Sequence, residues 1–169
     1  MNRQEIEMLS KMVAVTVVSM ALLGSALAQT PDDLRGTWTL VSSVTDKDGK
    51  KTEQFGSGAM GMMTLDDRGH FMLAIIGPGL PRFAANNRAA GTPEENKAVM
   101  SRSIAMIGTY SHNSADNTLT FKVESSTFPN WNGTQQKRII TAVSKDELQY
   151  ITPTASSGGV GTVSWRRAN

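Results

Sequence analysis

One pattern recurs along most of this chain: short stretches of alternating apolar and polar residues, each ending in a turn. It is clearest over residues 117–125, where Leu119, Phe121 and Val123 alternate with polar neighbours. Successive side chains of a strand point to opposite faces, so the pattern predicts strands with one buried and one exposed face. The expected strands are 37–44, 59–65, 70–76, 104–112, 117–125, 135–143, 147–152 and 160–167.

Eight strands joined by short turns predict an all-β fold, an eight-stranded antiparallel up-and-down β-barrel. Eight is also the strand number that closes a small barrel able to hold one ligand. A single short helix is expected after the third strand, from Pro93 to about Ser103. Thr92 can cap that helix, Pro93 suits its first position, and the acidic residues that follow favour its positive end.

The first 28 residues have the organisation of a secretory signal peptide. An uncharged apolar stretch over 12–28 follows Lys11 and ends in Ala26-Leu27-Ala28, the small-x-small pattern that signal peptidase accepts. A transmembrane anchor needs about 20 strongly apolar residues, and this stretch is shorter and interrupted by polar residues. We therefore expect a signal peptide over 1–28, a barrel domain over 29–169, export to a periplasm or the outside, and no stable membrane anchor.

Composition excludes several classes of function. The chain has no cysteine, which excludes disulfides, thiolate metal sites and a cysteine nucleophile. Its two histidines, His70 and His112, cannot form a three-histidine zinc site, and each stands at a strand end where we expect it to be solvated. We expect no metal and no cofactor. The net charge of +2 gives no reason to expect nucleic acid as a partner.

Five ordered segments carry a family resemblance. They are LRGTWTLVS (34–42), PRFAAN followed by GTPEE (81–95), GTY (108–110), VESS followed by FPNWNGT (123–134), and VSWRR (163–167). These segments resemble those of the lipocalin-like domain family of bacteria and fungi. The resemblance implies a barrel with a central cavity but no particular ligand. Members of that family often carry histidines just before the Val-Glu pair, where this chain has Phe121 and Lys122, so any imidazole chemistry of such relatives is lost here.

Two segments are candidates for the rim of a ligand cavity. A glycine- and proline-rich loop over 77–91 carries Arg82 and Phe83, and loops of this length in small domains are usually functional or mobile. The turn over 130–133 carries Asn130 and Trp131. Trp131 either covers a barrel mouth or forms part of a ligand portal beside the Asn130 amide.

The polar residues Glu124, Arg138 and Tyr110 allow two interpretations. Glu124 and Arg138 flank one hairpin, so a cross-strand ion pair is favoured, and inside the cavity Arg138 would instead anchor a carboxylate or carbonyl ligand. Tyr110 could place a phenol in the same cavity. The leading hypothesis is a secreted or periplasmic protein that binds a small, largely apolar molecule. The alternatives are an isomerase, cyclase or hydratase that uses these three residues, and a structural envelope protein.

The chain ends predict how the barrel is closed. Trp38 lies early in the first strand, and Arg166 and Arg167 end the last strand. Since the first and last strands of a closed barrel are neighbours, we expect an arginine to stack on the indole through a cation–π contact. The methionines Met60, Met62 and Met72 are expected either in the core or as an adaptable cavity lining, because alternation alone does not tell which face is the lumen.

Overall fold

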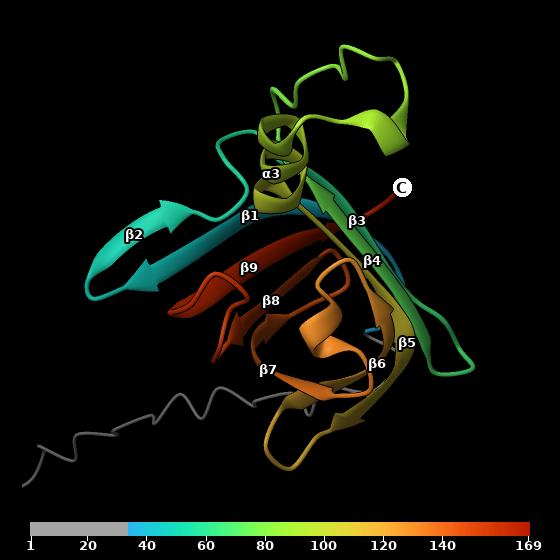
Figure 1. Cartoon of the computed structure of the whole chain (residues 1–169). Helices are drawn as coiled ribbons and strands as arrows, with labels where there is room; N and C mark the ends of the chain where they lie inside the picture. The colour runs from blue at the N-terminus through green and yellow to red at the C-terminus, as the bar shows by residue number, and fades with distance from the viewer. Residues whose placement is uncertain (1–33) are drawn as a thin grey trace, which may run out of the picture.

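The computed structural model describes residues 34–169, so the predicted signal peptide lies outside the described residues. The elements are β1 (Gly36–Lys47), β2 (Lys50–Glu53), β3 (Met60–Leu65), β4 (His70–Ile76), the 3₁₀ helix η1 (Arg88–Ala90), α3 (Pro93–Arg102), β5 (Ser103–Asn113), β6 (Thr118–Ser126), the 3₁₀ helix η2 (Pro129–Trp131), β7 (Gln135–Val143), β8 (Glu147–Thr152) and β9 (Val160–Arg167). All strand pairs are antiparallel, and β9 pairs with β1 to close the barrel (Figure 1). The predicted closed eight-stranded barrel is confirmed.

One further strand, β2, extends this barrel. It pairs with the C-terminal end of β1 (residues 44–47), whereas the N-terminal end of β1 (residues 36–39) pairs with β3 (Figure 1). A register shift between Leu40 and Ser42 lets the long β1 strand follow β9 along both halves. The β1–β2 turn uses Asp48 and Gly49, both at positive φ, as expected for an Asp-Gly hairpin. The alternation pattern does not predict β2, because KKTE has no apolar residue to alternate.

The helix α3 covers the end of the barrel where β4 ends and β5 begins (Figure 1). Its predicted start is confirmed: the Thr92 hydroxyl accepts a hydrogen bond from the Glu95 amide, and the Glu95 carboxylate accepts one from the Thr92 amide at 2.8 Å. The same carboxylate accepts the Ala84 amide at 2.9 Å. These backbone donors lower the pKa of Glu95. The capping box therefore also ties the 77–91 loop to the helix.

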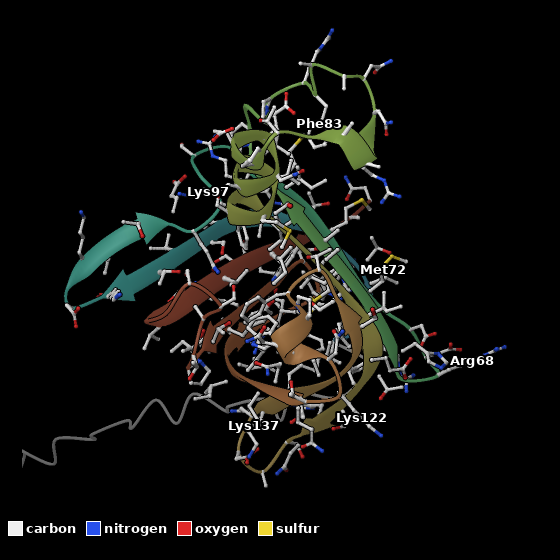
Figure 2. All side chains as sticks on the ribbon, viewed as in Figure 1. Arg68, Met72, Phe83, Lys97, Lys122 and Lys137 are labelled. Atoms are coloured by element: carbon white, nitrogen blue, oxygen red, sulfur yellow. The ribbon has the colours of Figure 1, made fainter. Side chains whose placement is uncertain are left out.

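Inward side chains fill most of the barrel, and one group of methionines faces away from it. Met63 is fully buried, whereas Met60, Met62 and Met72 are 75%, 57% and 60% exposed. Met72 is labelled on the outer side of the sheet in Figure 2. Both expectations for these three methionines are wrong, because their positions on β3 and β4 share the outer face of the pleat.

The end of the barrel opposite α3 is closed by the contact predicted from the chain ends. The guanidinium carbon of Arg167 lies 4.2 Å from the centre of the Trp38 ring. Arg167 also donates hydrogen bonds to the backbone carbonyls of Lys145 and Arg35, and the Trp38 indole donates to the Leu34 carbonyl at 2.9 Å. Arg166 is exposed and takes no part.

Candidate ligand-binding site

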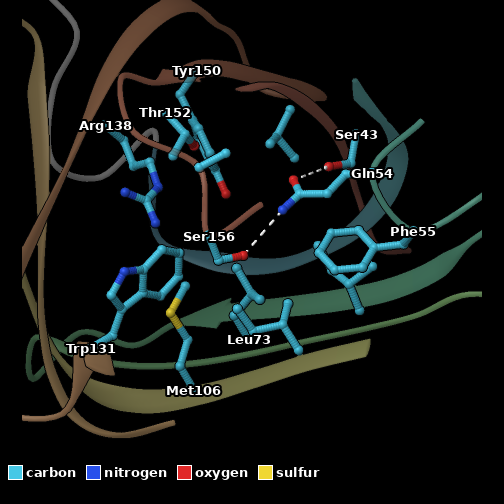
Figure 3. Close-up of a pocket in the computed structure, with 14 residues that line it drawn as sticks. Ser43, Gln54, Phe55, Leu73, Met106, Trp131, Arg138, Tyr150, Thr152 and Ser156 are labelled. Atoms are coloured by element: carbon cyan, nitrogen blue, oxygen red, sulfur yellow. Dashed lines mark hydrogen bonds between the residues drawn. The ribbon is translucent and has the colours of Figure 1, made fainter. Parts of the chain in front are cut away.

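A pocket opens into the barrel at the α3 end, and we call it the inner pocket (Figure 3). Its volume is about 40 Å³, enough for a few water molecules. It is lined by Ser43, Gln54, Phe55, Leu73, Ile75, Ile104, Met106, Trp131, Arg138, Tyr150, Thr152, Ala155, Ser156 and Val163. Of the site residues predicted from the sequence, only Trp131 and Arg138 line this pocket.

The lining has a polar and an apolar part. Arg138 on β7 lies beside Tyr150 and Thr152 on β8, and all three side chains are at least nine-tenths buried (Figure 3). The strands β4 and β5 supply the apolar part, with Leu73, Ile75, Ile104 and Met106. A molecule in the pocket would therefore meet polar groups on one side and hydrocarbon on the other.

Arg138 has an unusual environment for a charged side chain. It is 3% exposed, and its guanidinium carbon lies 5.6 Å from the ring centres of Phe121 and Trp131 and 6.0 Å from that of Tyr150. Its Nη1 donates to the Lys137 carbonyl at 2.8 Å. Burial lowers the pKa of Arg138, and the neighbouring Tyr150 opposes that shift. Burial likewise raises the pKa of Tyr150, so the phenol is neutral beside a charged guanidinium.

A wider cavity of about 440 Å³, which we call the mouth cavity, adjoins the inner pocket. It is lined by Gln54, Phe55, Lys97, Met100, Ser101, Ser103, Ile104, Thr127, Phe128, Ser156 and Ser157. Gln54, Phe55, Ile104 and Ser156 line both cavities and so mark the constriction between them. There the Gln54 amide donates to the Ser156 hydroxyl at 3.3 Å, which links the β2–β3 loop to the β8–β9 loop (Figure 3).

The turn that was predicted as a rim element forms the short helix η2. Trp131 is half-buried, packs edge-on against Phe128 with ring centres 5.6 Å apart, and covers Arg138. Asn130 is exposed and lines neither cavity. Trp131 thus belongs to the pocket wall, and Asn130 does not.

The other rim candidates lie away from both cavities. Arg82 is exposed, and Phe83 packs close to Gly91 within its own loop. Figure 2 shows Phe83 beyond α3, on the side away from the barrel. Their expected place at the cavity rim is wrong, because α3 and the Glu95 hydrogen bonds hold this loop outside the mouth.

The three polar groups of the enzyme hypothesis do not converge. Arg138 pairs with Leu119 across the strands, not with Glu124, and Glu124 is exposed. The expected ion pair is wrong because the connection through η2 is longer than a tight turn and moves the register. Tyr110 lies near the opposite end of the barrel, where its hydroxyl donates to the Asp66 carbonyl at 2.7 Å.

The two histidines differ in their surroundings. His70 is exposed, and its imidazole lies 2.9 Å from the Asp66 carboxylate. The His70 backbone amide, which donates to the same carboxylate, and then the imidazole lower the pKa of Asp66. The sequence predicts a solvated His112, but both of its ring nitrogens are buried, and neither has a hydrogen-bond partner among residues 34–169. Burial lowers the pKa of His112, with Asp116 opposing the shift. Within residues 34–169, no three histidine or acidic side chains gather as a metal site would require.

Several pocket residues were missed at the sequence level. Tyr150 and Thr152 follow Leu148 at alternating positions of one strand, so the strand pattern could have indicated them. Gln54 and Ser156 lie in loops whose sequences carry no such signal. Their meeting depends on how the barrel brings residues 102 positions apart into contact.

The fold and the pocket define a class of protein, a small closed β-barrel with a cavity at one end. A profile of the lipocalin-like domain matches residues 35–168. The chain belongs to this lipocalin-like domain family. None of the curated proteins matches the chain.

Two solved structures are similar in outline. One is a lipocalin-like protein from Bacteroides uniformis, with 12% identity and a TM-score of 0.45 over 80% of this chain and 99% of that one. The other is a de novo designed fluorescence-activating β-barrel, with 15% identity and a TM-score of 0.43 over 81% of this chain and 95% of that one. Among residues 34–169, no helix is long and apolar enough to cross a membrane.

Proposed function

We propose that this protein binds a small, largely apolar molecule that enters the barrel through the mouth cavity. The observation that carries the proposal is the continuity of two cavities along an apolar wall. Ile104 and Phe55 line both, so hydrocarbon in the mouth cavity can extend into the inner pocket without leaving apolar surface. The lipocalin-like fold supports small-molecule binding in general.

The volumes of the two cavities indicate how a ligand would be held. The inner pocket is well below the ~300–1,000 Å³ typical of sites for drug-sized ligands, whereas the mouth cavity is within that range. A ligand therefore places most of its body in the mouth cavity and one end in the inner pocket. Separation of Gln54 from Ser156 would widen the passage between them. We further propose that binding takes place outside the cytoplasm, on the evidence of the signal-peptide pattern over residues 1–28.

The enzyme hypothesis in the form suggested by the sequence is not retained. It required Glu124, Tyr110 and Arg138 to act on one molecule, and these groups lie on the outer surface, at the far barrel end and in the pocket, respectively.

The proposal is tested by blocking the passage. Ile104→Trp adds bulk where the two cavities meet, and Ile107→Trp adds the same bulk on the outer face of the same strand, where Ile107 is 48% exposed. Ligand is detected by native mass spectrometry of protein recovered from its host, and by thermal-shift screening of the purified chain with apolar compounds. Overpacking costs about 1–3 kcal/mol, so the melting temperature of each variant is measured first.

We expect the unaltered chain and Ile107→Trp to carry or gain a bound compound, and Ile104→Trp to lose it while remaining folded. Binding that is equal in both variants would place the ligand elsewhere. The absence of any bound or stabilising apolar compound would overturn the proposed function.

A further inference from the structure

We propose that the bound molecule is an amphipathic monocarboxylate whose carboxylate pairs with Arg138 in the inner pocket. The inference rests on the proposed function and specifies the chemistry of its ligand. Its basis is a buried cation that faces a cavity and has no acidic partner in the described chain.

Arg138 carries a buried positive charge. Burying a charge is costly unless it is paired, and arginine stays protonated at all ordinary pH values. Within residues 34–169, no carboxylate lies within 4 Å of its guanidinium, and neither cavity has an aspartate or glutamate in its lining. Contacts with Phe121, Trp131 and Tyr150 compensate part of this cost. An anion supplied by a ligand would provide the missing countercharge.

The inner pocket holds hydrogen-bond donors for such an anion. A guanidinium has five N–H donors in a planar fork, which matches the two oxygens of a carboxylate. One nitrogen of Arg138 donates to the Lys137 carbonyl, and the Tyr150 hydroxyl also interacts with the guanidinium. The buried Thr152 lines the same part of the pocket, as does the neutral Tyr150 phenol. The inner pocket thus offers one positive charge and additional hydroxyl groups.

The single cation of the inner pocket matches a ligand with one negative charge. Arg138 is the one cationic residue in the lining of the inner pocket, whereas Lys97 lines only the mouth cavity. A phosphate monoester, with nearly two negative charges at neutral pH, would leave one buried charge uncompensated. A carboxylate leaves none, and 40 Å³ is of the right order for so small a group.

The rest of the ligand would lie against apolar side chains. From Arg138 towards the mouth, the wall is formed by Met106 and Ile104, and the mouth cavity adds Met100 and Phe128. These side chains offer no charge, which fits a hydrocarbon group, aliphatic or aromatic, next to the carboxylate; the charged residue of the mouth cavity is Lys97. The flexible methionines allow either shape.

Arg138 could instead have a purely structural role, which differs from carboxylate binding in what it predicts for a variant. In that case the three aromatic rings would hold the guanidinium in place, and no ligand would depend on it. An arginine buried without an acidic partner carries a desolvation cost, which an apolar side chain of similar length removes. Arg138→Met is therefore expected to fold, with a melting temperature equal to or above that of the unaltered chain.

The test compares ligands that differ only in the head group. Octanoate and decanoate are titrated into the full-length mature chain by isothermal calorimetry, beside 1-octanol and 1-decanol. Charge-assisted hydrogen bonds predict that each acid binds about 10- to 100-fold more tightly than the alcohol of equal length. Arg138→Met should abolish that preference and leave the binding of the alcohols unchanged. Lys97→Met, which removes the cation of the mouth cavity, is the matched control and should keep the preference.

The outcomes separate the two proposals. If acid and alcohol bind equally well, or if the acid preference survives in Arg138→Met, the carboxylate assignment is overturned and the proposed function stands. If the preference is lost in Lys97→Met and kept in Arg138→Met, the anion binds at the mouth and the assignment is again wrong. If no acid or alcohol of this series binds while other apolar compounds do, the carboxylate assignment alone fails. If no apolar compound binds at all, both proposals fail.

Discussion

Replacement of Arg167 by alanine tests how this cysteine-free barrel is held closed. Arg167 is near the end of β9, where it stacks on Trp38 and donates to the backbone carbonyls of Arg35 and Lys145. The side chain thus connects the start of β1 to the segment before β8. Its removal should loosen the seam between the first and last strands.

The magnitude follows from those contacts. A cation–π contact contributes about 0.5–2 kcal/mol, and a hydrogen bond to a charged group about 1.5–3 kcal/mol. Arg167 is only half-buried, so solvent competes for its hydrogen bonds and the lower ends of these ranges apply. We expect Arg167→Ala to lower the free energy of unfolding by roughly 2–4 kcal/mol, a large share of the ~5–15 kcal/mol of a typical domain.

The assay is equilibrium unfolding in urea at neutral pH, followed by tryptophan fluorescence and far-UV circular dichroism. Arg166→Ala is the matched control: it removes an exposed arginine next in sequence and should change stability by no more than ~0.5 kcal/mol. Equal losses in the two variants would show that the stacking on Trp38 does not hold the seam. An unchanged midpoint in Arg167→Ala would refute the reasoning altogether.

Gly36 gives an independent check of the same contact. Its φ is +124°, and a Cβ atom at this position would come within 2.5 Å of the Arg167 guanidinium. Gly36→Ala is therefore expected to be destabilising, with backbone strain costing about 1–3 kcal/mol and the clash adding to it. The clash is absent when Arg167 is alanine, so the loss should be smaller in that background. Strictly additive losses would mean that the two residues do not interact.

Three further outcomes are expected. In urea unfolding, Met63→Ala should lower stability by about 2–5 kcal/mol and Met62→Ala by no more than ~0.5 kcal/mol. Similar losses would contradict the placement of Met63 inside the barrel and Met62 outside it. Burial lowers the pKa of His112, so the folded state favours the neutral imidazole and stability should fall as the pH drops below ~6.5. In His112→Phe the urea midpoint should therefore change less between pH 7 and pH 5 than in the unaltered chain. An equal change in both proteins would contradict this. Thr92→Ala should cost about 1 kcal/mol by removing the helix cap, measured by thermal unfolding, and no loss would mean that α3 adds little to stability.

The barrel was predictable because its signals are local. Alternation over residues 117–125 indicated one strand without reference to any other, and Asp48-Gly49 fixed a tight turn. The helix start depended on Thr92 and Glu95, three positions apart. Even the contact between Trp38 and an arginine of the last strand needed only the assumption that the first and last strands meet, and the structure shows that this arginine is Arg167.

The side of the sheet that faces the lumen was less accessible to sequence reasoning. On β3 the sequence MGMMTL places methionines on both faces of the strand, so alternation does not say whether Met62 or Met63 is inside. The structure buries Met63 against the core and leaves Met62 outside. A shift of one residue would exchange them, so the answer depends on packing with neighbouring strands.

The position of Arg138 was hidden for a related reason. The strand β7 reads QQKRIITAV, so one face combines Arg138 with Ile140 and the other combines Lys137 with Ile139. Each face pairs a cation with an isoleucine, and hydrophobicity alone does not choose between them. The structure buries Arg138 together with Ile140, although a charge inside a barrel is unfavourable. Conflicts between a local rule and the observed structure concentrate at functional sites, because function can retain a residue that stability disfavours. A chain in which methionine replaces Arg138 should therefore be at least as stable and bind carboxylates more weakly. That opposition between stability and carboxylate binding would separate a ligand-binding arginine from a structural one.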